Sequence, residues 1–191
     1  MGKFFGNLHL VLLVGLIFAV AVIVGYAPEV PANLNSVFRW LHVFFGILWI
    51  GLLYYLNFVQ VPAMPSIPAE MKGAVTGHIA PKVLFFFRYA ALLTVITGLV
   101  IAFVAGYGHR AMVLNGASAN ENLIGLGMWL ALIMAFNVWF IIWPAQKKIL
   151  GIVEASAEAK AAAAPRALYA SRTNVLLSLP MLYAMVSANL G

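Results

Sequence analysis

The feature that most constrains this 191-residue chain is a set of five apolar blocks, each about long enough to cross a lipid bilayer. A spanning α-helix needs roughly 20 mostly apolar residues, because each residue adds about 1.5 Å of rise. Only 8% of the residues are charged and the mean hydropathy is +1.01, so a soluble domain of this length could not bury the apolar surface. The blocks cover residues 7–26, 37–59, 81–107, 123–143 and 170–190. The sequence therefore predicts an all-α integral membrane protein, a single-domain bundle of five transmembrane helices over residues 1–191.

The distribution of Lys and Arg predicts the orientation of this bundle. With the N-terminus inside, the outer side holds only Arg39 and Arg110. The inner side holds Lys3, Lys72, Lys82, Lys147, Lys148, Lys160, Arg166 and Arg172. Because inner loops carry the excess of basic residues, we expect an N-in, C-out protein of the bacterial inner membrane. The formal net charge of +6 then reflects topology and contact with anionic membrane lipids, and we expect no nucleic-acid partner.

Several kinds of chemistry are excluded by absent residues. The chain has no cysteine, which rules out disulfides, iron–sulfur clusters and covalently attached c-type haem. It has no phosphate-binding glycine loop and neither a His-Glu-x-x-His nor a Gly-x-Ser-x-Gly motif, so hydrolase and nucleotide chemistry have no support. The five blocks contain no Asp or Glu, which argues against a proton pump.

Proline predicts the first inner connection and the start of the third span. The prolines at positions 62, 65 and 68 predict an extended, stiff inner loop. Pro81 is suited to the first turn of the third spanning helix, where its missing N–H costs nothing.

The second inner connection differs in composition. Residues 151–164 are alanine-rich and predict a short interfacial helix, or an extension of the fourth span, that ends at Pro165. Pro180 predicts a kink in the fifth span. Asn35 or Ser36 is the expected cap of the second span.

Polar residues on the second block recur at steps of three and four, which keeps them near one helix face. The set is Arg39, His42, Gly46, Trp49, Leu53, Asn57 and Gln60. Polar groups lack partners in hydrocarbon, so this stripe is expected to face the interior of the bundle.

His42 lies inside the second span, and Gly46 one turn on leaves room for a flat ring. An imidazole there could ligate haem iron or copper, and the alternative is a buried histidine hydrogen-bonded to neighbouring backbone. Met128 and Met185 lie at about the same depth, and Met185 is the candidate second ligand. Methionines at helical spacing also serve as flexible core filler, so that alternative stays open.

A second constellation lies in the inner half. Four blocks place polar side chains near one depth: Asn57, Gln60, Arg88, Asn137, Arg172 and Asn174. An intramembrane Arg needs a partner, which can be backbone, a carboxamide, a lipid phosphate or a bound anion such as a haem propionate. The alternative is a snorkelling Arg with Asn-mediated helix packing. The candidate cofactor-binding residues are His42, Gly46, Trp49, Asn57, Arg88, Asn137 and Asn174, and the candidate metal ligands are His42 and Met185.

Four stretches of the chain resemble the membrane part of the bacterial membrane-bound, cytochrome c-linked urate oxidase family. The stretches are residues 39–60, 88–98, 137–148 and 171–181. The second stretch begins at Arg88. The third contains the Asn-x-Trp and Trp-Pro-x-Gln-Lys-Lys motifs, and the fourth contains Ser-Arg-Thr-Asn. The segment around His42 is also similar to copper-resistance-type membrane proteins and a membrane protoporphyrinogen oxidase. The resemblance implies a short form without the cytochrome c domain, so electrons would leave through another protein.

Together these observations predict a redox-linked membrane core in which His42 binds a b-type haem or a metal. If the protein is an enzyme, it is an oxidoreductase that needs an external electron acceptor. The alternative is a non-catalytic accessory subunit of a larger membrane complex, with other membrane subunits as partners. The catalytic residues and the substrate are not identified by the sequence. A small-molecule carrier is less favoured, since there is no internal repeat and no pair of broken helices.

Overall fold

The computed structural model describes residues 2–26 and 33–189, and every regular element within these ranges is helical. The chain divides into two compact units, Met1–Val37 and Phe38–Gly191. Residues 27–32, between the first two predicted spans, and residue 190, the last of the fifth predicted span, lie outside the described residues.

The first unit contains α1 (Gly2–Phe5), α2 (Leu8–Tyr26) and the start of α3 (Leu34–Tyr54). The helix α2 agrees with the first predicted span, and none of its described residues is buried. The start of α3 corrects the predicted cap. Asn33 accepts a hydrogen bond from the Ser36 N–H at 2.9 Å, and Ser36 Oγ accepts one from the Asn33 N–H at 3.1 Å. Asn33 is thus the N-cap, and Ser36 completes a reciprocal capping pair.

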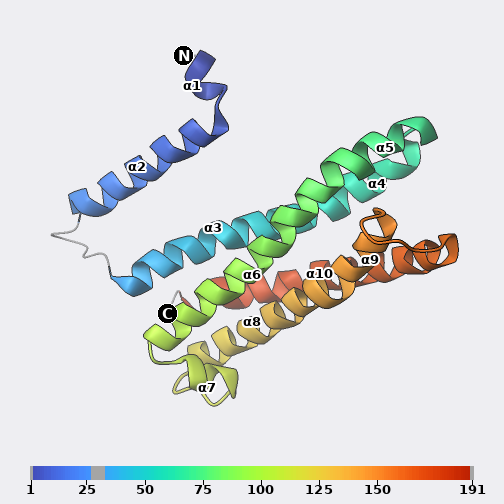
Figure 1. Cartoon of the computed structure of the whole chain (residues 1–191). Coiled ribbons are helices and arrows are strands. Elements are labelled where there is room, and N and C mark those ends of the chain that lie inside the picture. Colours follow the sequence, from blue (N-terminus) through green and yellow to red (C-terminus); the bar gives the residue numbers. More distant parts are fainter. Residues whose placement is uncertain (1, 27–32, 190–191) are drawn as a thin grey trace. The chain divides into compact units, whose positions relative to one another are not determined.

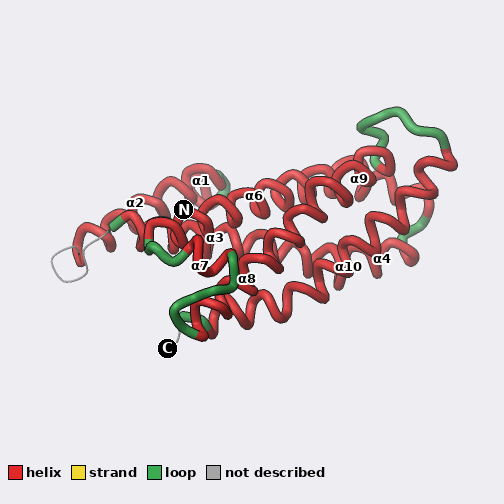
Figure 2. Tube along the Cα trace, turned by 90° about the horizontal axis from the view of Figure 1, so that it is seen from below, coloured by secondary structure: helices red, strands yellow, loops and turns green. Residues whose placement is uncertain are grey.

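The second unit is built from long helical rods that run alternately in opposite directions (Figures 1 and 2). The first rod continues α3 through the π-helical segment η1 (Tyr55–Gln60), α4 (Val61–Ala63) and η2 (Met64–Ser66). The second comprises η3 (Ala69–Met71), α5 (Lys72–Ala74), the π-helical segment η4 (Val75–Ile79) and α6 (Ala80–Val104). After the short α7 (Gly108–Met112), the third comprises α8 (Ala119–Phe136), the π-helical segment η5 (Asn137–Ile142) and α9 (Trp143–Ile149). The fourth is α10 (Ala157–Ser187), which packs along α8, η5 and α9.

Four stretches of the described chain are long and apolar enough to cross a membrane: Leu8–Tyr26, Leu34–Ser66, Ala69–Val104 and Ala119–Ile149. The protein is therefore all-helical with several long apolar helices, which indicates a membrane protein. The fifth predicted span lies in α10, which is long enough but is not among these apolar stretches. Five spans thus remain a prediction.

The predicted extended loop at the first inner connection is wrong. Pro62 and Pro65 lie in the first turns of α4 and η2, inside a rod that stays helical from α3 to Ser66. Only Ile67 and Pro68 are extended, with ψ angles of 128° and 143°. Helical structure therefore continues well past the predicted end of the second span at residue 59. Pro81 does lie in the first turn of α6, as expected.

The second inner connection also differs from its prediction. The alanine-rich segment neither extends the fourth span nor ends at Pro165. It is instead the first part of α10, which contains both Pro165 and Pro180. Ser156 starts this helix by accepting a hydrogen bond from the Ala159 N–H at 3.2 Å. The turn before it is made at Gly151, whose φ of +71° favours glycine.

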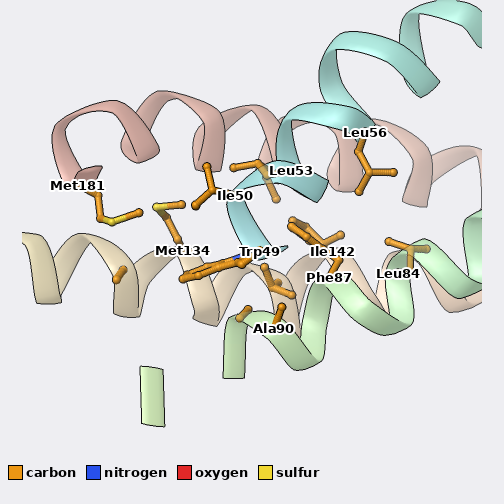
Figure 3. Close-up of a cluster of buried hydrophobic side chains, with 14 residues drawn as sticks. Trp49, Ile50, Leu53, Leu56, Leu84, Phe87, Ala90, Met134, Ile142 and Met181 are labelled. Carbon is orange, nitrogen blue, oxygen red and sulfur yellow. The ribbon is translucent and has the colours of Figure 1, made fainter. Parts of the chain in front are cut away.

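The core of the second unit lies between the rods at mid-length (Figure 3). Trp49 is fully buried, and α3 also contributes Ile50 and Leu53. Figure 3 shows these side chains pointing toward Phe87 and Ala90 of α6, Met134 of α8 and Met181 of α10. The predicted inward stripe of the second block is therefore confirmed at Trp49 and Leu53.

The α7 end of the unit is held by a charged pair. Arg110 donates to both carboxylate oxygens of Glu121, at 2.9 and 2.7 Å, and this hydrogen bonding raises the pKa of Arg110. A Cβ on Gly125 would collide with the carbonyl oxygen of Ala111, so glycine permits the close packing of α7 on α8.

Candidate functional site

His42 is half-buried on α3 and packs against α6. Its Nδ1 lies 2.9 Å from the carbonyl oxygen of Thr94 and 3.3 Å from Thr97 Oγ1. A carbonyl only accepts, so this geometry requires the proton on Nδ1. Nε2 of the neutral ring then carries the lone pair, and it has no hydrogen bond to the described residues. The structure thus shows the buried, backbone-bonded histidine, with one ring nitrogen still available.

Gly98 of α6 creates the space for this ring. A Cβ placed on Gly98 would lie 2.8 Å from His42 Cε1 and 3.1 Å from Nδ1. Only glycine therefore allows the imidazole to lie this close to the backbone of α6. Gly98, Ala102 and Gly106 recur at every fourth position, a pattern that usually indicates close helix packing and gives no signal of the contact with His42.

Gly46 and Trp49 lie further along the same face of α3. A Cβ on Gly46 would meet only Thr94 Cγ2, at 4.0 Å, so the position is not tightly packed. Trp49 is 0% exposed, and its Nε1 is buried with no hydrogen-bond partner among the described residues. A buried indole N–H without an acceptor is costly, since folding removes its water.

Met185 lies near the end of α10 that contacts the start of α3. Arg39 Nη1 donates to Asn189 Oδ1 at 3.1 Å, which brings the start of α3 beside the end of α10. His42 and Met185 each lie about one turn further into the bundle from this contact. The Met185 side chain packs toward Gly127 of α8, whereas His42 packs toward α6. Ligation by Met185 stays a prediction.

The carboxamides of α10 and η5 form a buried pair. Asn137 Nδ2 donates to Asn174 Oδ1 at 2.9 Å, and Asn174 Nδ2 donates to the Met134 carbonyl oxygen at 2.9 Å. Asn174 is 0% exposed and Asn137 is 8% exposed. Each carboxamide therefore donates to a partner within the chain, as expected for buried polar groups in an apolar surrounding.

Two further hydrogen bonds join α10 to the first rod. Asn57 Nδ2 donates to Ser171 Oγ at 2.8 Å and to the Leu53 carbonyl oxygen at 2.9 Å. Tyr54 Oη and Ser178 Oγ lie 2.9 Å apart. The α10 residues of these pairs, together with Asn174, recur at steps of three and four, so they form one stripe. We call the three pairs Asn57–Ser171, Asn137–Asn174 and Tyr54–Ser178 the polar layer.

Asn57 and Asn137 both belong to π-helical segments, η1 and η5. A π-turn displaces the regular backbone hydrogen bonds and frequently marks a functional site. The backbone carbonyls that accept from side chains, Leu53 and Met134, lie just before these segments. The carboxamides thus complete backbone bonding where the helices depart from α geometry. Sequence periodicity contains no direct signal of these segments.

Arg88 is held by aromatic rings rather than by an anion among the described residues. Its guanidinium carbon lies 3.8 Å from the centroid of Trp143 and 5.2 Å from that of Tyr89. Nη1 lies 3.5 Å from the Leu84 carbonyl oxygen, a long contact. Trp139 Nε1 donates to the Arg88 carbonyl oxygen at 3.1 Å. Cation–π stacking is favourable for a partly desolvated Arg, and sequence reasoning did not consider it.

The remaining histidines do not gather around a metal. Within residues 2–26 and 33–189, no group of three or more His, Cys, Asp or Glu side chains is arranged to hold a metal ion. His42 is therefore the candidate ligand with a defined environment in the described part of the chain. Arg172 is exposed, whereas the Gln60 Oε1 is buried and unpartnered among these residues.

Comparison with known proteins adds one finding. Residues 100–191 match the family model described as Urate oxidase N-terminal. The C-terminal half of this chain is therefore similar to that family. The match includes the stretches at 137–148 and 171–181, with Asn137 and Asn174, whereas His42 and Arg88 lie outside it. No match to a curated protein or to a solved structure was found.

Proposed function

We propose that this chain is the membrane core of a redox-linked protein related to urate oxidases, spanning the bacterial inner membrane five times with its N-terminus inside. His42 is the proposed axial ligand of a b-type haem or a metal. The observation that supports this role most directly is the bond from His42 Nδ1–H to the Thr94 carbonyl oxygen, with Nε2 left available. Metal-bound histidines are held in this way, because a hydrogen bond at one ring nitrogen fixes the ring and the tautomer for ligation by the other.

The residues around His42 fit one axial ligand. The ring is fixed by Thr94 and lies against Gly98, and Gly46 leaves the adjacent face of α3 without a side chain. Met185 remains the proposed second ligand, at a similar depth. A bound b-type haem would supply reversible one-electron transfer. A separate electron-carrier protein is the proposed acceptor of the electrons.

In this proposal the polar layer positions the helices and does not contact a cofactor. The donors of Asn57, Asn137 and Asn174 are used within the chain. Interhelical hydrogen bonds of this kind fix the register between rods in an apolar medium. Arg88 lies with Trp143 and Tyr89 and is assigned to the same structural role.

The test is the absorbance spectrum of the protein purified in detergent from a haem-sufficient host. A Soret band is expected in the unsubstituted protein and in the His78→Ala control, since His78 is exposed in η4. The band should vanish in His42→Ala and shift in Met185→Leu. Size-exclusion chromatography checks that each variant stays folded. A Soret band that persists unchanged in folded His42→Ala would refute the proposal.

A second candidate is an accessory subunit of a larger membrane complex, and two observations favour it. The helix α2 is apolar along its length, and the carboxamides of the polar layer donate to partners within the chain without any ligand. A colourless protein that co-purifies stoichiometrically with other membrane subunits would support this candidate over the first.

A further inference from the structure

The third rod ends in α9, which lies beside the start of α10 (Figures 1 and 2). A groove lies between these two segments. One wall is formed by η5 and α9, with Phe140, Pro144 and Lys148, and the other by α10, with Ala162 and Arg166. Its volume is about 460 Å³. This lies within the range of roughly 300–1,000 Å³ that is usual for small-molecule sites. None of the residues discussed above as the candidate site lines it.

The sequence explains why the groove forms. The α10 wall belongs to the alanine-rich run, so no long side chain fills the space beside α9. The two rods are held together below it by the small residues Ala145, Ala163 and Ala167, which are all buried. Small side chains let two helices approach closely, and the groove runs along the outside of this seam.

The charge of the groove is positive. Lys148 and Arg166 are both exposed and line it, and no Asp or Glu is among its lining residues. Glu158, which is close in sequence to the lining residue Ala159, is hydrogen-bonded in the first turn of α10. Hydrogen bonds from backbone and from Ser156 lower the pKa of Glu158, as expected for a carboxylate that caps a helix. The two cations therefore face an open, uncompensated space suited to an anion.

The groove is also polarised along the helix axes. The bond between Asn137 and Asn174 and the seam of Ala145 with Ala163 set the two rods antiparallel and in register. In that register Lys148 lies nearest the end of the bundle, Arg166 about a turn deeper, and Phe140 deepest. Phe140 is 68% exposed. The groove thus passes from cationic to apolar toward the middle of the rods.

We propose that this groove binds one anionic phospholipid. The phosphate lies between Lys148 and Arg166, and an acyl chain lies along Pro144 and Phe140. A soluble phosphate compound would leave the apolar part unused, whereas a neutral lipid would leave the two cations without a partner. Basic pockets between helices at the cytoplasmic face are suited to acidic lipid headgroups, and this end holds most of the inner-side Lys and Arg. The proposal depends on membrane insertion and not on haem binding.

The test is native mass spectrometry of the full chain in neutral detergent, titrated with phosphatidylglycerol or with phosphatidylcholine of the same acyl chains. One phosphatidylglycerol should bind in preference to phosphatidylcholine. Lys148→Gln/Arg166→Gln should weaken that binding about 30-fold. Each basic residue near an anionic lipid contributes about 1 kcal/mol, and the loss of two such contributions corresponds to about this factor in affinity. The matched control is Lys160→Gln/Arg172→Gln, which removes the same charge from α10 outside the groove.

A second pair of variants tests the groove itself without changing charge. Ala162→Trp fills the α10 wall and should abolish the preferred binding, whereas Ala161→Trp, on an exposed position outside the groove, should leave it intact. Equal losses of phosphatidylglycerol binding in the groove variants and in their controls would show that the groove is not the binding site. Equal binding of phosphatidylcholine, or competition by soluble glycerol phosphate at the same concentration, would overturn the lipid as its occupant.

Discussion

His42 and the polar layer both place hydrophilic groups among apolar helices, yet they differ in how those groups are used. In the polar layer, each carboxamide of Asn57, Asn137 and Asn174 donates to a partner within the chain. At His42, one ring nitrogen is bonded to backbone and the other has no bond to the described residues.

This difference suggests different experiments for the polar layer and for His42. A group that is fully satisfied inside the chain contributes to stability and register, and a ligand would have to displace its partner. A group that is fixed but only half satisfied is ready for an external ligand. The polar layer should therefore respond to substitution in unfolding experiments, and His42 in spectra.

The largest effect is expected from Gly98→Ala. The new Cβ would lie 2.8 Å from His42 Cε1, so the ring must move and its bond to Thr94 is lost. Haem content, measured by the pyridine haemochrome assay, should fall to near zero. Gly51→Ala is the matched control, since nothing lies within 4 Å of that Cβ. Normal haem content in folded Gly98→Ala would show that the position of His42 is unimportant.

The next effect is expected in the polar layer. Asn174→Ala leaves Asn137 Nδ2 without its acceptor in the core and removes the side-chain bond to the Met134 carbonyl oxygen, which still accepts from the Asn137 N–H. The expected loss in the free energy of unfolding is about 1–3 kcal/mol, measured by denaturation in mixed micelles. Any Soret band should be retained. A variant that loses its haem but keeps its stability would place Asn174 in the cofactor site instead.

A smaller effect is expected for Arg88→Gln, which removes the cation stacked on Trp143 at 3.8 Å. The expected destabilisation is about 0.5–2 kcal/mol, and Arg88→Lys should recover part of it. The same denaturation measurement applies, with Trp fluorescence as the probe. If Arg88 instead binds a propionate, Arg88→Gln would change the haem spectrum at unchanged stability.

The smallest effect is expected for Tyr54→Phe. It removes the 2.9 Å contact with Ser178, whose hydroxyl still donates to the Val175 carbonyl oxygen at 2.7 Å. Interhelical hydrogen bonds in membrane proteins average about 0.6 kcal/mol, so the midpoint of unfolding should shift only slightly. A loss as large as that of Asn174→Ala would mean that the polar layer acts as one cooperative network, which a double-mutant cycle with Ser178→Ala would measure.

The sequence was sufficient for the features that follow from hydrophobicity and helical period. Apolar blocks located the helices, and the step of three and four placed Trp49 and Asn57 inward. The common depth of Asn137 and Asn174 followed from counting residues along antiparallel spans, and the structure joins them directly.

Other features depend on neighbours that are distant in sequence. The role of Gly98 follows from His42 on another helix, and the partner of Arg88 is a ring on a third. Helices continue through Pro62 and Pro165. This could not be predicted, because the local sequence around a proline does not show whether a helix ends there or continues through it. Whether α10, the fourth rod, spans a membrane is not decided by its composition.

The π-helical segments also bear on how related chains should be aligned. A helix with a π-turn accommodates one extra residue, and every side chain beyond it rotates by about 100° relative to an uninterrupted α-helix. The face of the first rod that includes His42 is therefore not the face that continues past Gln60. A homologue that lacks one residue within η1 or η5 would keep its apolar composition, yet its inner end would turn toward different neighbours. Gaps at these two points, rather than in the loops, would mark where the architecture diverges.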